Sequence, residues 1–239
     1  AGPEVVPNVH PARYPATYPK GLVGRAGWHQ ADTGCPIGPH TWDAALAASE
    51  TAVTAADLVL SGAREAYALC RPPGHHAFAD MAGGFCFLNN SAIAAQHLRR
   101  DHVRVAVLDV DVHHGNGTQG IFYERDDVLT MSIHADPSTY YPYFWGHAHE
   151  TGTGKGHGFN LNLPLPLGSP DAPWLEAGDK ALAHIRDFAP TALVVALGLD
   201  AAASDPLQGL KVTGAGFHAM AGKIASLGLP TVLVQEGGY

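Results

Sequence analysis

Two carboxylates and two imidazoles fall within six residues of one segment, "LDVDVHHGNGTQ", which begins at Leu108. Asp109, Asp111 and His113 occupy alternate positions, so in an extended chain their side chains point the same way. Ionised carboxylates are costly to bury unless they are paired or bind metal. Asp111 and His113 offer one oxygen and one nitrogen ligand, and Asp200, from a distant segment, adds a second oxygen. Three protein ligands leave one position open, which is the pattern of a catalytic zinc site.

Adjacent histidines, His75 and His76, follow the stiff segment "RPPG". Histidine pairs in a loop suit proton transfer near neutral pH, provided that each ring has an orienting partner. Asp109 and Asn116 are the nearest candidates in chemistry for that role. The alternative is a pair of solvated loop histidines.

The segment "GGFCFLNN" offers a wall for a narrow pocket. Gly84 allows a close approach of backbone to a ligand, and Phe85 supplies an aromatic surface. Tyr239, after two glycines, is a candidate oxyanion donor. The alternative for the glycines is an ordinary turn into a helix.

Apolar strands alternate with amphipathic helices from Thr41 onward, which predicts an α/β fold with a mostly parallel sheet and helices on both faces, in three layers. Expected strands cover 65–70, 103–110, 127–134, 158–165, 191–199 and 230–235. Expected helices cover 41–62, 88–100, 117–124, 171–189 and 213–228.

The four segments that contain most of the candidate metal-binding and catalytic residues all follow predicted strands. They are "CRPPGHHA", "DVDVHHGNG", "GLDAAASDP" and "EGGY". In open parallel sheets, ligands bind at the carboxyl ends of the strands, so we expect these segments to meet at one edge. This convergence favours a metal site over the alternative of surface acids beside a loop histidine.

Composition restricts the function classes. The chain has 239 residues, of which 46% are hydrophobic, and its net charge is 14 − 22 = −8. This charge disfavours nucleic acid and anionic membranes as partners and is compatible with cationic substrates. Three widely spaced cysteines predict a cytoplasmic protein, and no signal peptide or membrane span is visible.

Two stretches lack a regular pattern. Residues 1–40 are rich in Pro and Gly and are expected to be extended or loop-like, whereas residues 134–158 form a long aromatic loop of the kind that is usually functional.

The motifs "RPPGHHA", "GGFCFLNN", "LDVDVHHGNGTQ", "LGLDAAASDP" and "EGGY", in this order, resemble the histone deacetylase superfamily, and the loop "YPYFWGHAHETGTGKGHG" is similar to its bacterial acetylpolyamine amidohydrolases and class II-like members. The resemblance implies the arginase/deacetylase fold, a single domain over 1–239, and deacetylation of acetylpolyamines or acetyl-lysine-like substrates. Because family members extend beyond both ends of the match, one interpretation is that N-terminal and C-terminal segments lie outside this sequence. Residues 1–40 would then be a rim or homodimer element.

The resemblance also implies residue roles. One Zn²⁺ per chain would be bound by Asp111, His113 and Asp200. A structural K⁺ or Na⁺ would be bound in part by Asp109, Ser132 and Ile133. The expected catalytic residues are His75, His76, Asp109, Asn116 and Tyr239, and the expected substrate-binding residues are Gly84, Phe85 and Tyr141. Asp32 is a candidate for the acid that would hold a cationic substrate tail.

Other functions remain alternatives at this stage. They are protein lysine deacetylation, non-catalytic binding of acetylated ligands, a structural metal domain, and an arginase-like ureohydrolase with two metals. The last needs a bridging acid two positions after the ligand histidine, where this chain has Gly115.

Overall fold

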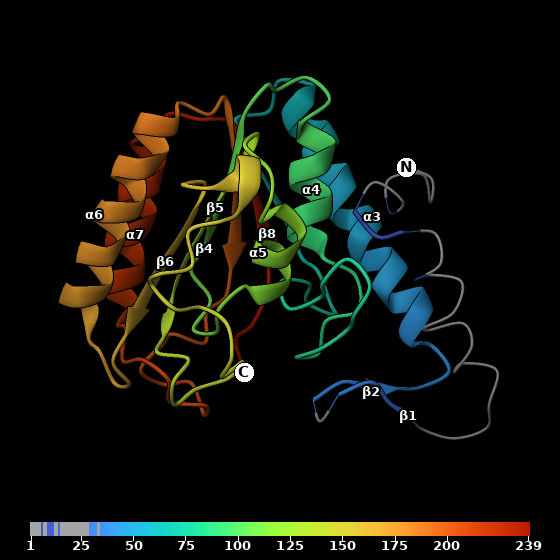
Figure 1. Ribbon diagram of the computed structural model, residues 1–239, viewed down its shortest axis with the longest axis horizontal. Coiled ribbons are helices and arrows are strands. Elements are labelled where there is room, and N and C mark those ends of the chain that lie inside the picture. The colour runs from blue at the N-terminus through green and yellow to red at the C-terminus, as the bar shows by residue number, and fades with distance from the viewer. Residues whose placement is uncertain (1–5, 7–8, 12–13, 15–28, 33) are drawn as a thin grey trace.

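The computed structural model describes residues 6, 9–11, 14, 29–32 and 34–239. A central sheet lies between two layers of helices (Figure 1). All neighbouring strands in this sheet are parallel, in the order β3-β8-β7-β4-β5-β6. Its strands are β3 (Glu65–Ala68), β4 (Val105–Asp109), β5 (Val128–Ala135), β6 (Asn160–Leu165), β7 (Ala192–Leu197) and β8 (Thr231–Gln235). The predicted three-layer α/β architecture is confirmed.

Helices cover both faces of the sheet. In Figure 1, α3 and α4 lie on one side and α6 and α7 on the other. The bounds are α3 (Thr41–Leu60), α4 (Asn90–Leu98), α5 (Asn116–Phe122), α6 (Asp171–Phe188) and α7 (Gly214–Ala225). Every helix and strand expected from the sequence is present, with ends shifted by a few residues. Among the described residues, no helix combines the length and the apolarity needed to cross a membrane.

Each face of the sheet has its own hydrophobic core. Residues of α3, α4 and the sheet form one cluster, and residues of α6, α7 and the opposite sheet face form the other. The strands β4 and β5 are buried along their whole length, which explains why they read as continuous apolar runs. Two helices begin at side-chain caps, where Asn89 accepts a hydrogen bond from Ala92 N–H and Thr213 accepts one from Gly216 N–H.

The described part of residues 1–40 contributes to the first core. Val6, Val9 and Tyr14 are buried there, and the Tyr14 hydroxyl donates to the Phe87 carbonyl at 2.7 Å. A short antiparallel pair, β1 (His29–Gln30) and β2 (Pro36–Ile37), interrupts the predicted loop. Much of the predicted rim or dimer element lies outside the described residues.

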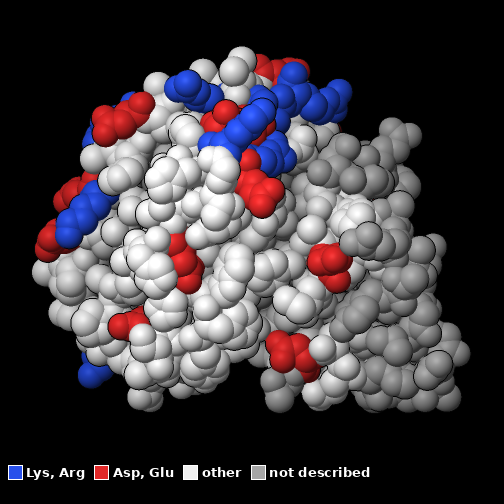
Figure 2. All heavy atoms as spheres, viewed as in Figure 1, with Lys and Arg blue, Asp and Glu red and all other residues white. Residues whose placement is uncertain are grey.

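Charged side chains are unevenly placed on the face drawn in Figure 2. Lys and Arg gather near the upper edge among Asp and Glu, while most of the middle of this face carries uncharged residues.

Candidate active site

The metal-ligand candidates come together at the carboxyl ends of β4 and β7. Asp111 and His113 follow β4, Asp200 follows β7, and one ligand atom from each lies within 4.8 Å of the others. His113 Nδ1 is 3.0 Å from Asp111 Oδ1 and 3.2 Å from Asp200 Oδ2. The parallel pairing of β4 with β7 produces this arrangement, because it places two chain-distant strand ends side by side.

These residues fit a divalent cation. Asp200 Oδ2 is fully buried and, despite its closeness to His113, has no hydrogen bond of acceptable geometry. Burial and the adjacent Asp111 carboxylate raise the pKa of Asp200, because two like charges disfavour each other's ionised form. An oxygen, nitrogen and oxygen donor set accepts zinc, and also iron or cobalt.

Close backbone packing fixes the two carboxylates. Gly237 N–H donates to Asp111 Oδ2 at 2.8 Å, and Val112 N–H donates to Asp200 Oδ1 at 2.9 Å. A Cβ atom on Gly198 would lie 2.2 Å from Asp111 Oδ2, so no larger residue fits at that position.

The tandem histidines lie beside the triad, and both are buried. His75 Nδ1–H donates to Asp109 Oδ2 at 2.8 Å, and His75 Nε2 lies 3.8 Å from Asp111 Oδ1. His76 Nδ1 is 2.6 Å from Asn116 Oδ1, and its ring centroid is 5.7 Å from that of His113. The predicted orienting partners, Asp109 and Asn116, are therefore where the sequence analysis placed them.

The surroundings shift the pKa values of the two histidines in opposite directions. Burial alone would lower the pKa of His75, but the carboxylates of Asp109, Asp111 and Glu236 outweigh it, and the pKa lies well above the usual value. Burial and the neighbouring His75 and His113 hold the pKa of His76 well below that value. Such a divided pair is typical of sites that carry out acid–base chemistry.

Gly84 is required by its neighbours. Its φ is +52°, and a Cβ atom there would lie 2.3 Å from the His76 ring. Tyr141 packs edge-on against His76, with ring centroids 4.9 Å apart. Asp32 Oδ2 accepts hydrogen bonds from Gly84 N–H and the Tyr141 hydroxyl, both at 3.2 Å. Asp32 therefore ties the Gly84 segment to the aromatic loop, a role that the sequence did not reveal.

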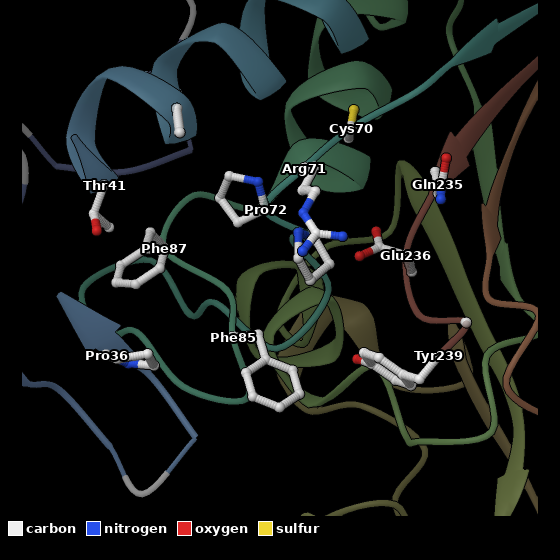
Figure 3. A pocket seen from close by; sticks show the side chains of 13 residues that line it. Pro36, Thr41, Cys70, Arg71, Pro72, Phe85, Phe87, Gln235, Glu236 and Tyr239 are labelled. Atoms are coloured by element: carbon white, nitrogen blue, oxygen red, sulfur yellow. The ribbon is translucent and has the colours of Figure 1, made fainter. Parts of the chain in front are cut away.

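Phe85 and Tyr239 line a cavity of about 590 Å³ to which neither the triad residues nor the tandem histidines contribute (Figure 3). Their ring centroids are 5.8 Å apart, and both side chains are roughly half exposed. Arg71 and Glu236 also line the cavity, whereas Tyr141 does not. Burial, with the charges of Asp111 and Asp200, raises the pKa of Tyr239, which keeps its phenol protonated at neutral pH.

The loop after β5 is held by a buried polar network. Glu150 Oε2 accepts hydrogen bonds from Gly146 N–H at 2.9 Å and Gln119 Nε2 at 2.8 Å, and His134 Nε2 donates to the Gly146 carbonyl at 2.8 Å. This network fixes the loop that carries Tyr141. None of these polar residues stood out in the sequence, because single Glu, Gln and His residues have no spacing signal.

The predicted monovalent-cation residues lie on β4 and β5. Asp109 pairs with Ser132 across these strands, next to Ile133, and both line a small polar cavity. The Ser132 hydroxyl is hydrogen-bonded to His134 Nδ1 at 2.8 Å, and both Asp109 oxygens already accept hydrogen bonds. The K⁺ or Na⁺ site therefore stays a prediction.

The fold and the site define a class of α/β protein with a candidate metal-ligand triad and two adjacent histidines at the carboxyl edge of a parallel sheet. The family model described as the histone deacetylase domain matches residues 6–239, and the chain belongs to that family.

Known relatives agree with this assignment. The chain is 52% identical over 220 residues to an acetylpolyamine amidohydrolase of Burkholderia pseudomallei, covering 92% of this chain and 64% of the relative. It is 50% identical over 222 residues to acetylpolyamine amidohydrolase 1 of Pseudomonas aeruginosa, with the same coverage. The chain thus spans about two thirds, 64%, of the length of these curated relatives.

A solved structure matches along the whole chain. The crystal structure of acetylpolyamine aminohydrolase from Burkholderia pseudomallei superposes with a TM-score of 0.96 at 46% identity, covering 100% of this chain and 78% of that one. The parallel sheet and its helices are therefore those of the deacetylase fold.

Proposed function

We propose that this protein hydrolyses the amide bond of small N-acetylated amines, with acetylpolyamines as the substrate class, and that it uses one Zn²⁺ ion per chain. The observation that carries the proposal is the cluster of Asp111, His113 and Asp200, whose buried Asp200 Oδ2 accepts no hydrogen bond, beside two oriented histidines. The names of the similar relatives support the choice of substrate class.

The ion would be held by Asp111, His113 and Asp200. When bound, it would act as a Lewis acid toward the substrate carbonyl and make a water molecule more acidic.

The two histidines would divide the proton transfers. The Asn116 side-chain oxygen can only accept, so His76 carries its proton on Nδ1 and keeps a lone pair on Nε2 for a substrate or water proton. His75 is surrounded by carboxylates, which favour its protonated form. His76 would therefore act as the main general base, and later as the acid that protonates the leaving amine, while Asp109 orients His75.

The other expected residues would bind and orient the substrate. The phenol of Tyr239 would donate a hydrogen bond to the substrate carbonyl, and the Gly84 carbonyl would accept one from the amide N–H. Phe85 and Tyr141 would flank the alkyl chain of the substrate. Asp32 offers a carboxylate near this path for a cationic tail.

The test is acetate release by the zinc-loaded protein from two substrates, a mono-acetylated diamine and an acetyl-lysine peptide. We expect faster turnover of the diamine. Faster turnover of the peptide would favour a protein lysine deacetylase, and binding of both without turnover would favour a non-catalytic binder. Metal analysis should give one ion per chain. Two ions per chain would favour the ureohydrolase alternative. The structure argues against that alternative, because the bridging acid it needs would replace Gly115, and a Cβ atom there would lie 2.3 Å from Asp109 Oδ2.

A further inference from the structure

Glu236 is a buried carboxylate to which the proposed chemistry gives no role. It follows β8 directly and points from the end of that strand toward the Arg71–Pro72 segment (Figure 3). Its Oε2 atom accepts hydrogen bonds from Gly74 N–H at 2.6 Å and from His75 N–H at 3.0 Å. Its Oε1 atom accepts one from the Ser91 hydroxyl at 2.7 Å.

These bonds join three segments that are far apart in the sequence. The side chain reaches from the end of β8 to the backbone of the tandem-histidine loop and to the first turn of α4. The loop has little room to move on its other side, because a Cβ on Gly74 would lie 2.4 Å from Asn90 N. Glu236 therefore fixes the backbone of His75 directly.

The next residue fixes the metal-ligand triad. Gly237 N–H donates to Asp111 Oδ2 at 2.8 Å, and a Cβ on Gly237 would lie 2.2 Å from Asp200 Oδ2. Glu236 thus holds the histidine loop through its side chain, and Gly237 holds the triad residue Asp111 through its backbone N–H. This dipeptide therefore contacts both the histidine loop and the triad.

We propose that Glu236 is a positioning residue that holds the tandem histidines in register with the triad. This inference rests on the proposed function. The side chain acts as an acceptor for two backbone N–H groups, and an amide oxygen can accept the same bonds. Without an acceptor, two buried N–H groups lose their partner and the loop must shift to satisfy them. A displacement of about 1 Å in a catalytic group can reduce the rate about 10²-fold.

The experiment compares Glu236→Gln with Glu236→Met. Both side chains are uncharged and similar in length, but only glutamine keeps an oxygen acceptor, whereas the methionine sulfur accepts hydrogen bonds only weakly. We expect kcat of Glu236→Met to fall about 10- to 100-fold with KM within about threefold of wild type, and Glu236→Gln to recover most of kcat. Zinc content should stay at one ion per chain in both variants, because Glu236 is outside the triad.

A second readout does not depend on catalysis. Hydrogen exchange of the Gly74 and His75 amides, followed by NMR, should be slow in wild type and in Glu236→Gln and at least about tenfold faster in Glu236→Met. Ser91→Ala is the matched control, because it removes the bond to Oε1 and leaves both backbone bonds in place. Its amide exchange should match wild type.

Three results would overturn the proposal. They are fast exchange of both amides in wild type, a kcat of Glu236→Met equal to wild type, and a loss in Glu236→Gln as large as in Glu236→Met. If the methionine variant does not fold, the amide exchange rates of wild type and the kcat of Glu236→Gln still test the proposal. If wild type itself releases no acetate, the proposed function fails while the exchange data still test the anchor.

Discussion

The Nδ1 atom of His76 lies 2.6 Å from the side-chain oxygen of Asn116, a neutral acceptor, whereas His75 Nδ1 faces the carboxylate of Asp109 at 2.8 Å. Two adjacent histidines thus have chemically different partners. These partners fix the orientations of the two rings. The pKa of His75 is raised by the carboxylates around it, whereas burial and the neighbouring His75 and His113 lower the pKa of His76.

His76→Ala should lower kcat about 10²- to 10⁴-fold, because the general base and acid is removed. Zinc content should not change, since His76 is not a triad member. The measurement is acetate release at saturating substrate, together with metal analysis. His218→Ala, which alters an exposed histidine on α7, is the control. A rate close to wild type would remove His76 from its proposed role.

Asp200→Asn should abolish stable zinc binding, because one of three charged or polar ligands loses its charge. For wild type, zinc at 100 times its Kd should stabilise the fold by about 2.7 kcal/mol, seen as a rise in Tm. The variant should show almost no rise. Asp126→Asn, at an exposed position, should behave like wild type. An equal rise in Tm for Asp200→Asn would place the ion elsewhere.

Gly84→Ala should destabilise the protein by at least about 1–2 kcal/mol, because residue 84 has a positive φ and the new methyl group would overlap the His76 ring. Gly222→Ala is the opposite case. Gly222 lies inside α7, and a Cβ atom there would have no neighbour within 4 Å beyond the nearby backbone of its own helix. Alanine at this position should therefore raise the free energy of unfolding by about 0.5–1 kcal/mol. Urea unfolding of the two variants checks both signs, and a stable Gly84→Ala would contradict the close approach of Gly84 to His76.

Titration of His10 should lower the free energy of unfolding at acid pH. Burial lowers its pKa to about 4, although the hydrogen bond to the Ala79 carbonyl and the charge of Asp80 act in the other direction. The unfolded chain, with a pKa near 6.5, binds a proton first as the pH falls. The stabilisation from neutral His10 is therefore complete above pH 6.5 and is lost between 6.5 and 4, by about 3 kcal/mol in total.

Urea unfolding at pH 7 and pH 4.5 measures this effect. His10→Gln should show a smaller loss of stability between the two pH values than wild type, because its side chain does not titrate. His218→Gln removes an exposed histidine and should keep the wild-type difference. Equal pH dependence of all three proteins would show that His10 titrates normally in the folded state.

Much of the fold followed from local pattern. The apolar runs at 105–108 and 192–197 are long enough for strands and too short for most helices, and both lie in buried strands of the structure. The closeness of Asp111, His113 and Asp200 followed as well, because each lies within four residues of the end of such a strand. The long loop after β5 was evident from its composition, but its anchoring through Glu150 was not.

The sequence by itself determined the residue types of the site and the strand ends on which they lie, because burial and alternation are written in local periodicity. Only the tertiary structure decided which strands are neighbours. It placed β8, the last strand, between β3 and β7, and so brought Glu236 against the backbone of His75 and Gly237 against Asp111. Lateral strand order depends on how helices pack across both faces of the sheet, and no spacing along the chain encodes it.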